Sequence, residues 1–502
     1  MVLRLADGRG KWLMITARKL SLTWFRSRWR RSTLPCVYAA ALLLGACWMV
    51  GGCRPADRTA DGRVIVSYWE KWTGFELAAM QQVVDDFNAS QRRIEVRILP
   101  VSQIDVKLML ATAGGNPPDL AGLWSFSVPD FSEKGALTPI NGALQRKGIS
   151  RETFIPIFWD LCGHQGFQWA VPSTPASLAL HYNRALFREA GLDPDAPPRT
   201  LAELETMNEK LTLVEVSRTG QVVRLSYSQL TPEERQARKF LLVRAGHLPQ
   251  EPGWWLDNMG VWFGGSLYDG DRRITADAPG NLAAMRWFRE TSDKYGIENL
   301  RNYGASGGNF ASPQNPFLSG RVAMELQGVW MHNFVDKYAP DLDWGVAPFP
   351  AADPATKDVT LVESDVLVIP RGAPHAAEAF EFLAYLCQRE PAEKLALGQR
   401  KFTALRDVSP AFYQKHPNPH IREFVRLANS PQARSVPRLG IWREYQEEMR
   451  IASGNALWQV ASPEQALAQV QQRVAWRWER ARARWDRVAE IRRKEWQNRD
   501  LP

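Results

Sequence analysis

Short apolar runs and segments of helical periodicity alternate along the chain from residue 64 onward. The run 64–69 is typical of a buried strand, and 76–88 carries apolar residues at helical spacing. Residues 94–99 then alternate between apolar and polar, 107–113 has helical spacing, and 119–124 is again apolar. Strands that alternate with helices predict βαβ units and a mainly parallel sheet, so the predicted fold class is α/β.

The alternation starts again in the second part of the chain. Residues 177–182 predict a strand and 200–211 a helix. A less regular stretch follows, with a predicted hairpin over 214–223 and a charged helical insert over 228–244. Further elements are helices at 279–295 and 376–387 and strands at 322–326 and 366–369. Two such series in a chain of 502 residues predict at least two domain-sized cores.

The first 53 residues predict an export signal. Nine basic residues precede a long uncharged apolar run that ends at Gly51-Gly52-Cys53. A basic segment, an apolar core and a small-residue cleavage site in this order are typical of a signal peptide. The end of the run resembles a bacterial lipobox, so we expect Cys53 to be lipidated and residues 54–63 to be a tether. Cys47 as the lipidated residue and an uncleaved signal anchor are the alternatives.

The net charge of +9 belongs to the two ends of the chain. Residues 1–53 contribute +8 and 471–502 contribute +5, which leaves 54–470 at −4. A body of this charge lacks the basic stripe that nucleic-acid binding needs, so we expect no nucleic-acid partner. The seven histidines are scattered and no Cys-x-x-Cys occurs, so we expect no metal and no cofactor. Whether Cys162 and Cys387 form a disulfide stays open.

Several short motifs follow one another along the chain. They are Tyr-Trp-Glu-Lys-Trp-Thr-Gly at 68–74, Gly-Asn-Pro-Pro-Asp-Leu at 115–120, Gly-Ala-Leu-Thr-Pro at 135–139, Phe-Gly-Gly at 263–265, Gly-Arg-Val-Ala-Met at 320–324 and Gly-Val-Trp at 328–330. In this order the sequence resembles the extracellular solute-binding proteins that deliver sugars to ABC importers, the group related to the maltose- and glycerol-phosphate-binding components. The resemblance runs from about Val64 to about Val470.

The resemblance implies a two-lobed periplasmic-binding-protein-like fold of class II, with a ligand held between lobes that crossing hinge strands join. Lobe 1 is expected over 64–172 plus about 366–430, and lobe 2 over 175–362 plus about 434–465. One departure concerns specificity: many relatives have paired glycines where this chain has Glu363 and Ser364. The sugar specificity of the relatives therefore does not transfer.

The implied function is that of the carbohydrate-binding component of an ABC importer, a monomer that docks to the permease subunits. It would be exported and held by its N-terminal lipid on a membrane, facing the periplasm or the cell exterior. A membrane-tethered ligand sensor is the alternative. A further alternative is a glycoside hydrolase with Glu70 and Glu363 as its paired carboxylates. Because the sequence contains no nucleophile elbow, phosphate loop or metal-ligand spacing that would support catalysis, we expect that the protein is not an enzyme.

Aromatic and polar side chains at strand ends are the candidate ligand contacts. Tryptophan makes up 21 of the 502 residues, and sugar rings stack on aromatic planes while their hydroxyls need polar partners. Each aromatic candidate could instead be a core residue, and each candidate carboxylate could instead form an ordinary salt bridge. Arg443 is expected to pair with one of these carboxylates or with an acidic sugar. The candidates are Trp69, Glu70, Trp72, Thr73, Trp124, Ser125, Tyr182, Trp330, Glu363, Ser364, Trp442 and Arg443.

Residues 466–502 predict a basic amphipathic C-terminal helix. Apolar residues from Leu467 to Ile491 recur in steps of three and four, and the opposite face is rich in arginine. Two interpretations stay open: the helix packs on the second lobe, or it lies on anionic lipid.

Overall fold

The predicted alternation of strands and helices opens the described part of the chain. The computed structural model describes residues 57–305 and 307–501, so the predicted export signal and its Cys53 lie outside the described residues. β1 (Val64–Glu70), α2 (Gly74–Ser90), β2 (Ile94–Pro100), α3 (Ile104–Ala113) and β3 (Leu120–Trp124) follow one another. β1 pairs in parallel with β2 and with β3, which confirms the predicted βαβ arrangement. The prediction of a mainly parallel sheet is wrong, because most strand pairs beyond β3 are antiparallel.

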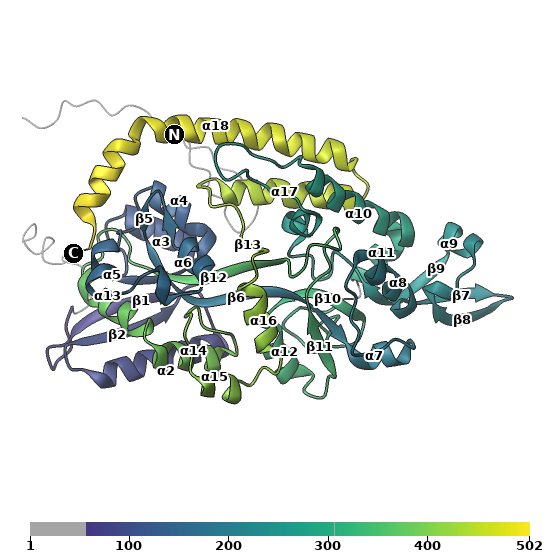
Figure 1. Cartoon of the computed structure of the whole chain (residues 1–502), viewed down its shortest axis with the longest axis horizontal. Coiled ribbons are helices and arrows are strands. Elements are labelled where there is room, and N and C mark those ends of the chain that lie inside the picture. The colour runs from purple at the N-terminus through teal and green to yellow at the C-terminus, as the bar shows by residue number, and fades with distance from the viewer. Residues whose placement is uncertain (1–56, 306, 502) are drawn as a thin grey trace, which may run out of the picture. The chain divides into compact units, whose positions relative to one another are not determined.

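Two strands run through the middle of the main sheet and connect its halves (Figure 1). They are β6 (Ala170–Asn183) and β12 (Thr360–Val368), which pair antiparallel to each other. β12 also pairs with β3. The second half of β6 pairs with β10 (Val322–Gly328) along one edge and with β11 (Trp344–Ala347) along the other. The order of the described strands is β2-β1-β3-β12-β6-β10-β9-β7-β8. We call the part around β1 to β3 lobe 1 and the part around β7 to β11 lobe 2.

The remaining elements cover the two halves of this sheet. Lobe 2 also contains β7 (Leu213–Arg218), β8 (Gln221–Ser226) and β9 (Phe240–His247). The others, in chain order, are η1 (Ser125–Ser127), α4 (Val128–Glu133), α5 (Asn141–Arg146), η2 (Arg151–Thr153), α6 (Pro156–Leu161), β4 (Gly163–His164), β5 (Phe167–Gln168), α7 (Arg184–Glu189), α8 (Leu201–Leu211), η3 (Tyr227–Gln229), α9 (Pro232–Ala237), η4 (Leu256–Phe263), α10 (Pro279–Tyr295), α11 (Ile297–Ala305), α12 (Met331–Tyr338), α13 (Ala376–Leu386), α14 (Arg389–Gln399), α15 (Pro410–Lys415), α16 (Ile421–Ala428), β13 (Ala433–Arg434), α17 (Trp442–Leu457) and α18 (Pro463–Arg499).

The hairpin predicted over 214–223 is confirmed, whereas the helix predicted over 228–244 is wrong for most of its length. β7 and β8 pair antiparallel around the predicted turn. In the predicted insert, only α9 is an α-helix, and β9 pairs with β7 and β10 from residue 240 on. Phe240 and Leu242 are buried while Leu241 is exposed. Pairing with neighbouring strands decides this segment, and such tertiary context overrides local preference.

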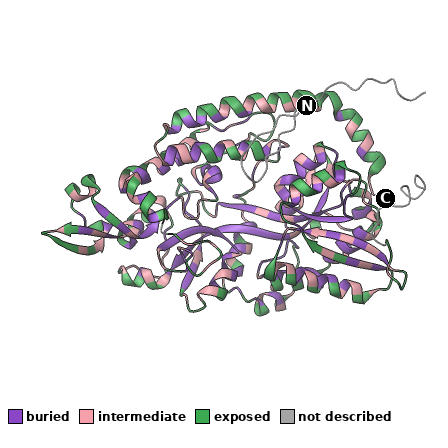
Figure 2. Ribbon diagram, turned by 180° about the vertical axis from the view of Figure 1, so that it is seen from behind, coloured by how far each residue is buried: buried purple, intermediate pink, exposed green. Residues whose placement is uncertain are grey.

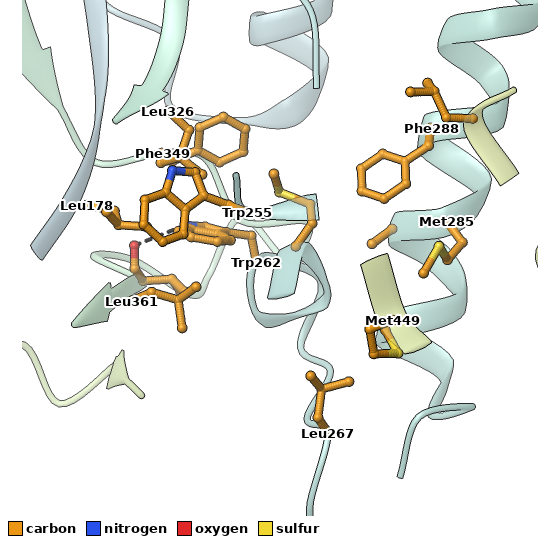
Figure 3. Packing of buried hydrophobic residues seen from close by; sticks show 14 of the residues in the cluster. Leu178, Trp255, Trp262, Leu267, Met285, Phe288, Leu326, Phe349, Leu361 and Met449 are labelled. Carbon is orange, nitrogen blue, oxygen red and sulfur yellow. Dashed lines mark hydrogen bonds between the residues drawn. The ribbon is translucent and has the colours of Figure 1, made fainter. Parts of the chain in front are cut away.

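Each lobe has its own hydrophobic core. In lobe 1, α2 and α13 pack their apolar faces against β1 and β2. In lobe 2, Trp262 and Phe349 pack against each other beside Trp255 (Figure 3). Trp262 is fully buried and donates its indole N–H to the Val359 carbonyl at 3.1 Å. Val359 immediately precedes β12, so this contact fixes the lobe 2 core to a crossing strand.

The C-terminal helix α18 contacts both lobes. Its first half packs on α17 and α10 in lobe 2 through Leu467, Val470 and Val474. Near its other end, Trp496 packs edge-on against Trp169 of lobe 1, with ring centroids 4.8 Å apart. Figure 1 shows the helix extending from one half of the protein to the other, and Figure 2 shows that much of its surface is exposed. The predicted packing on the second lobe therefore describes only its first part.

No helix in the described ranges combines the length and the apolar character needed to cross a membrane. Cys162 and Cys387, whose pairing the sequence left open, are both free thiols.

Candidate functional site

A pocket of about 450 Å³ lies between the two lobes, beside the crossing strands. Lobe 1 contributes the loop between β1 and α2, the start of α3 and the end of β3, and lobe 2 contributes aromatic residues from three segments. β6 and β12 contribute polar residues between them. Because β1 and β3 present their carboxyl ends here, the pocket occupies the position at which open α/β sheets bind ligands.

Half of the residues predicted from sequence line this pocket. Lobe 1 supplies three of them from the ends of β1 and β3, β12 supplies two, and lobe 2 supplies one at the start of α12. They are Trp72, Thr73, Trp124, Trp330, Glu363 and Ser364.

Lys71, which the sequence analysis did not select, lies at the centre of the lobe 1 wall. Its ammonium is 2.9 Å from Asp365 Oδ1 and 3.2 Å from Glu70 Oε1. The same nitrogen lies 4.7 Å from the ring centroid of Trp72 and 5.2 Å from that of Trp124. Burial lowers the pKa of Lys71, but the two carboxylates outweigh burial and raise it. Lys71 is therefore a buried cation that is fully paired within the protein.

Glu70 lies behind Lys71 and does not reach the pocket. The residue is fully buried, and its carboxylate accepts hydrogen bonds from Tyr68 Oη at 2.5 Å and from the Lys71 backbone N–H at 2.7 Å. Burial raises its pKa, while Lys71 acts in the opposite direction. A Cβ on Gly122 of β3 would overlap this carboxylate. Glycine at 122 thus makes room for an acid whose role is to position Lys71.

A second lysine belongs to the same charge cluster. Lys401 Nζ lies 2.7 Å from Glu76 Oε1 and 4.0 Å from Asp365 Oδ2. Asp365 also accepts a hydrogen bond from Thr174 Oγ1 at 2.8 Å. Thr174 and Asp365 belong to β6 and β12, so the cluster connects both crossing strands to lobe 1.

Glu363 is the acid of the pocket that has no partner. Its carboxylate makes no hydrogen bond or ion pair with any residue in the described part of the chain, and the side chain is only partly buried. Burial, together with the neighbouring acids Asp365 and Asp257, raises its pKa to about 7. Asp257 lies behind it in η4, and burial raises the pKa of that acid to about 6. Glu363 is available to accept hydrogen bonds from a ligand.

Aromatic rings form the lobe 2 side of the pocket. The Trp330 indole lies so close to Gly328 that a Cβ there would overlap it, so this glycine permits the ring position. Trp254 is 44% exposed and lies 4.5 Å, between centroids, from Phe310. Phe310 in turn meets Phe334 edge-on at 4.7 Å. These rings offer flat apolar surfaces for stacking.

The other predicted contacts lie outside the pocket. Tyr182 is buried in the lobe 2 core against Phe187, with ring centroids 5.1 Å apart. Trp442 is 1% exposed and packs edge-on against Tyr445 at 5.7 Å. Both positions are those of core aromatics, the alternative that the sequence left open.

The remaining predicted residues do not line the pocket and contact other parts of the protein. Trp69 is partly buried against the lobe 1 core, and Ser125 is buried at the start of η1. Arg443 pairs with Asp105 of α3 and lies 3.3 Å from Ser127 Oγ. Its guanidinium therefore connects α17 with lobe 1. Its carboxylate partner is Asp105, and not Glu70 or Glu363.

A larger cavity of about 840 Å³ lies between lobe 1, lobe 2 and α18. Arg438 donates to the carbonyls of Asp160 and Gly163, His164 Nε2 lies 2.9 Å from Glu133 Oε1, and Asp271 is exposed to solvent. The smaller pocket, in which an unpaired acid accompanies several indoles between the lobes, is the better candidate for a ligand site. No group of three or more His, Cys, Asp or Glu in the described ranges is placed to hold a metal ion.

Residues 76–392 match the family of bacterial extracellular solute-binding proteins. The chain belongs to that family. It is also 22% identical to the maltotriose-binding protein of Pyrococcus abyssi (strain GE5 / Orsay) over 300 residues, which cover 59% of this chain and 55% of that protein.

Solved structures of sugar-binding proteins share the fold. The structure of CpMnBP1 with mannotriose bound has a TM-score of 0.69 and 26% identity, and covers 82% of this chain and 99% of that chain. The sugar-binding protein MalE from Xanthomonas citri has a TM-score of 0.67 and 19% identity, and covers 84% of this chain and 99% of that chain. The predicted two-lobed periplasmic-binding-protein-like fold is therefore confirmed.

Proposed function

We propose that this member of the family is the carbohydrate-binding component of an ABC importer. The observation that carries the proposal is the pocket between the lobes, in which indole side chains accompany a carboxylate that has no partner among the described residues. Sugar rings stack on such indoles, and their hydroxyls donate to such a carboxylate. The mannotriose bound to CpMnBP1, which shares 26% identity with this chain, supports the same class of ligand.

In this proposal the sugar enters between the lobes and the lobes close around it. Hinge closure around ligands is the motion of periplasmic binding proteins, and the crossing strands β6 and β12 are the natural hinge. The closed form then docks to the permease subunits. Export, lipid attachment at Cys53 and a monomeric state complete the proposal as the sequence predicts them.

The hydrolase alternative is disfavoured by the position of Glu70. Both oxygens of its carboxylate are engaged by Tyr68 and Lys71, and the residue is fully buried. A glycosidase needs two carboxyl groups that flank the scissile bond, and Glu363 has no second free acid of this kind beside it in the pocket. The sensor alternative shares the pocket and differs only in the partner protein.

The proposal is tested by titrating the mature chain, from residue 54 on, with mannotriose, maltotriose and a wider oligosaccharide panel in a calorimeter. We expect saturable binding that Trp330→Ala weakens about tenfold or more, since a stacked ring is lost. Trp476→Ala is the matched control, because Trp476 is 56% exposed on α18 and lies outside the pocket. Absence of binding to every saccharide would refute the proposal, and conversion of the sugar would favour the hydrolase.

A further inference from the structure

The pocket contains an acidic side chain that no basic side chain of the described residues neutralises. The lysines that line it, Lys71 and Lys401, are already paired with protein carboxylates: Asp365 and Glu70 for the first, Glu76 for the second. The pocket therefore offers no free cation among its described lining residues. It does offer one free acid, Glu363.

Acids also surround Glu363 on its own side. Asp365 lies two residues further along β12, and Asp257 approaches from η4. Both raise the pKa of the Glu363 carboxyl. Asp365 is itself paired with Lys71, whereas Glu363 has no ion pair with a described residue. An anionic ligand would add a further negative charge to this group, whereas a cationic ligand would compensate it.

The protein itself shows how a cation is held at this site. The Lys71 ammonium lies between two carboxylates and two indole faces, those of Trp72 and Trp124. Carboxylates supply the charge-assisted hydrogen bonds, and the faces of the indole rings attract the cation.

The same two kinds of group occur near Glu363, without the cation. Trp330, at the start of α12, and Glu363 of β12 line the same pocket. Trp254 and Trp330 both line the pocket, and neither ring has a Lys or Arg of the described chain over its face. A ligand ammonium would fill the place that Lys71 fills on the opposite wall.

We propose that the pocket takes a saccharide with a free amino group, whose ammonium pairs with Glu363 beside the faces of Trp254 and Trp330. This inference rests on the proposed carbohydrate-binding function and narrows the class of ligand. Glu363 is then the specificity-determining residue.

The test compares saccharides of the same length and linkage that carry an ammonium group, no charge or a carboxylate. Mature chain is titrated at constant pH and low salt with glucosamine oligosaccharides, the corresponding neutral glucose oligosaccharides and the corresponding glucuronic acid oligosaccharides, in several linkages. Mannotriose and maltotriose are included as neutral references. We expect the amine to bind about tenfold tighter than its neutral counterpart, which corresponds to about 1.4 kcal/mol, and the uronate to bind most weakly.

Glu363→Gln separates charge from shape. The variant keeps the size of the side chain and one oxygen that accepts hydrogen bonds but removes the charge, so we expect it to abolish the preference for the amine over the neutral sugar. Glu490→Gln on α18 is the matched control and should leave the preference unchanged, because that glutamate is exposed and does not line the pocket. Thermal unfolding of each variant checks that the fold is intact.

The outcomes distinguish the two claims. Equal or tighter binding of neutral or acidic sugars overturns the inference and leaves the carbohydrate function in place, as does an amine preference that survives Glu363→Gln. Failure of every saccharide to bind a correctly folded chain overturns the proposed function, and the inference with it.

Discussion

Trp496 is the side chain through which the C-terminal helix is anchored to lobe 1. Its ring meets Trp169 edge-on at 4.8 Å and Phe167 edge-on at 5.4 Å, and it stacks on Trp485 at 5.4 Å. Immediately beyond it, the Asp500 carboxylate accepts a hydrogen bond from the Gly142 backbone N–H at 3.0 Å. Trp496→Ala removes the apolar part of this anchor and leaves the polar part in place.

The expected cost follows from the burial of the ring. Trp496 is 1% exposed, and a buried tryptophan removes about 150–250 Å² of surface from water. At about 25 cal/mol per Å² this burial is worth about 4–6 kcal/mol, and large-to-small substitutions of buried aromatics cost about 3–5 kcal/mol. Because a helix end can detach instead of leaving a cavity, we expect a loss near the lower value, about 3 kcal/mol.

The assay is urea unfolding of the mature chain, followed by circular dichroism. Trp476→Ala is the control: the ring is 56% exposed on the same helix, so its removal should change the free energy of unfolding by less than about 0.5 kcal/mol. If the two variants were equally stable, the end of α18 would not be docked on lobe 1 in solution. Binding of the isolated tail to anionic vesicles at low salt would then support the lipid interpretation.

Two further substitutions test the buried charges. Gly122→Ala should destabilise the fold by about 1–3 kcal/mol and weaken ligand binding, because the added methyl group overlaps the Glu70 carboxylate; Gly304→Ala, whose Cβ meets nothing, is the control in the same unfolding and binding assays. Burial, and then the nearby Glu251, raises the pKa of Glu325 to about 8. The folded chain therefore retains a proton that the unfolded chain releases above its ordinary pKa of 4.5, so this group lowers the free energy of unfolding by about 1.4 kcal/mol per pH unit up to about pH 8. Glu325→Gln should remove that slope from urea unfolding measured between pH 6 and 8, and an unchanged slope would contradict a buried neutral acid.

The strand and helix alternation made the fold class predictable, and the loop after the first strand made part of the site predictable. Trp72 and Thr73 lie in that loop, and parallel strands present such loops at a common edge. Trp254 and Phe310 could not be found in this way, because they lie outside regular elements and reach the pocket only through the packing of lobe 2. Lys401 could not be found either, because Glu76 and Asp365, which it contacts, lie far from it in the sequence.

Buried and ligand-facing aromatics look alike in a sequence. Tyr182 and Trp442 are as apolar as Trp330, and only the tertiary structure shows that they are enclosed by the lobe 2 core. Local sequence is also insufficient for the segment predicted as a helix over 228–244. A short charged segment is compatible with a helix or a strand, and only its pairing with β7 shows that its last part is β9.

For Glu70, however, the sequence held a signal. Side chains in a strand alternate between faces, so Val66, Tyr68 and Glu70 share one face of β1, and all three are fully buried. An acid on the buried face needs a cation or hydrogen-bond donors close by, and the next residue, Lys71, provides both. Glu70 consequently neutralises Lys71 in advance of any ligand. That pairing, together with the one between Lys401 and Glu76, leaves Glu363 as the acid without a protein partner among the described lining residues of the pocket.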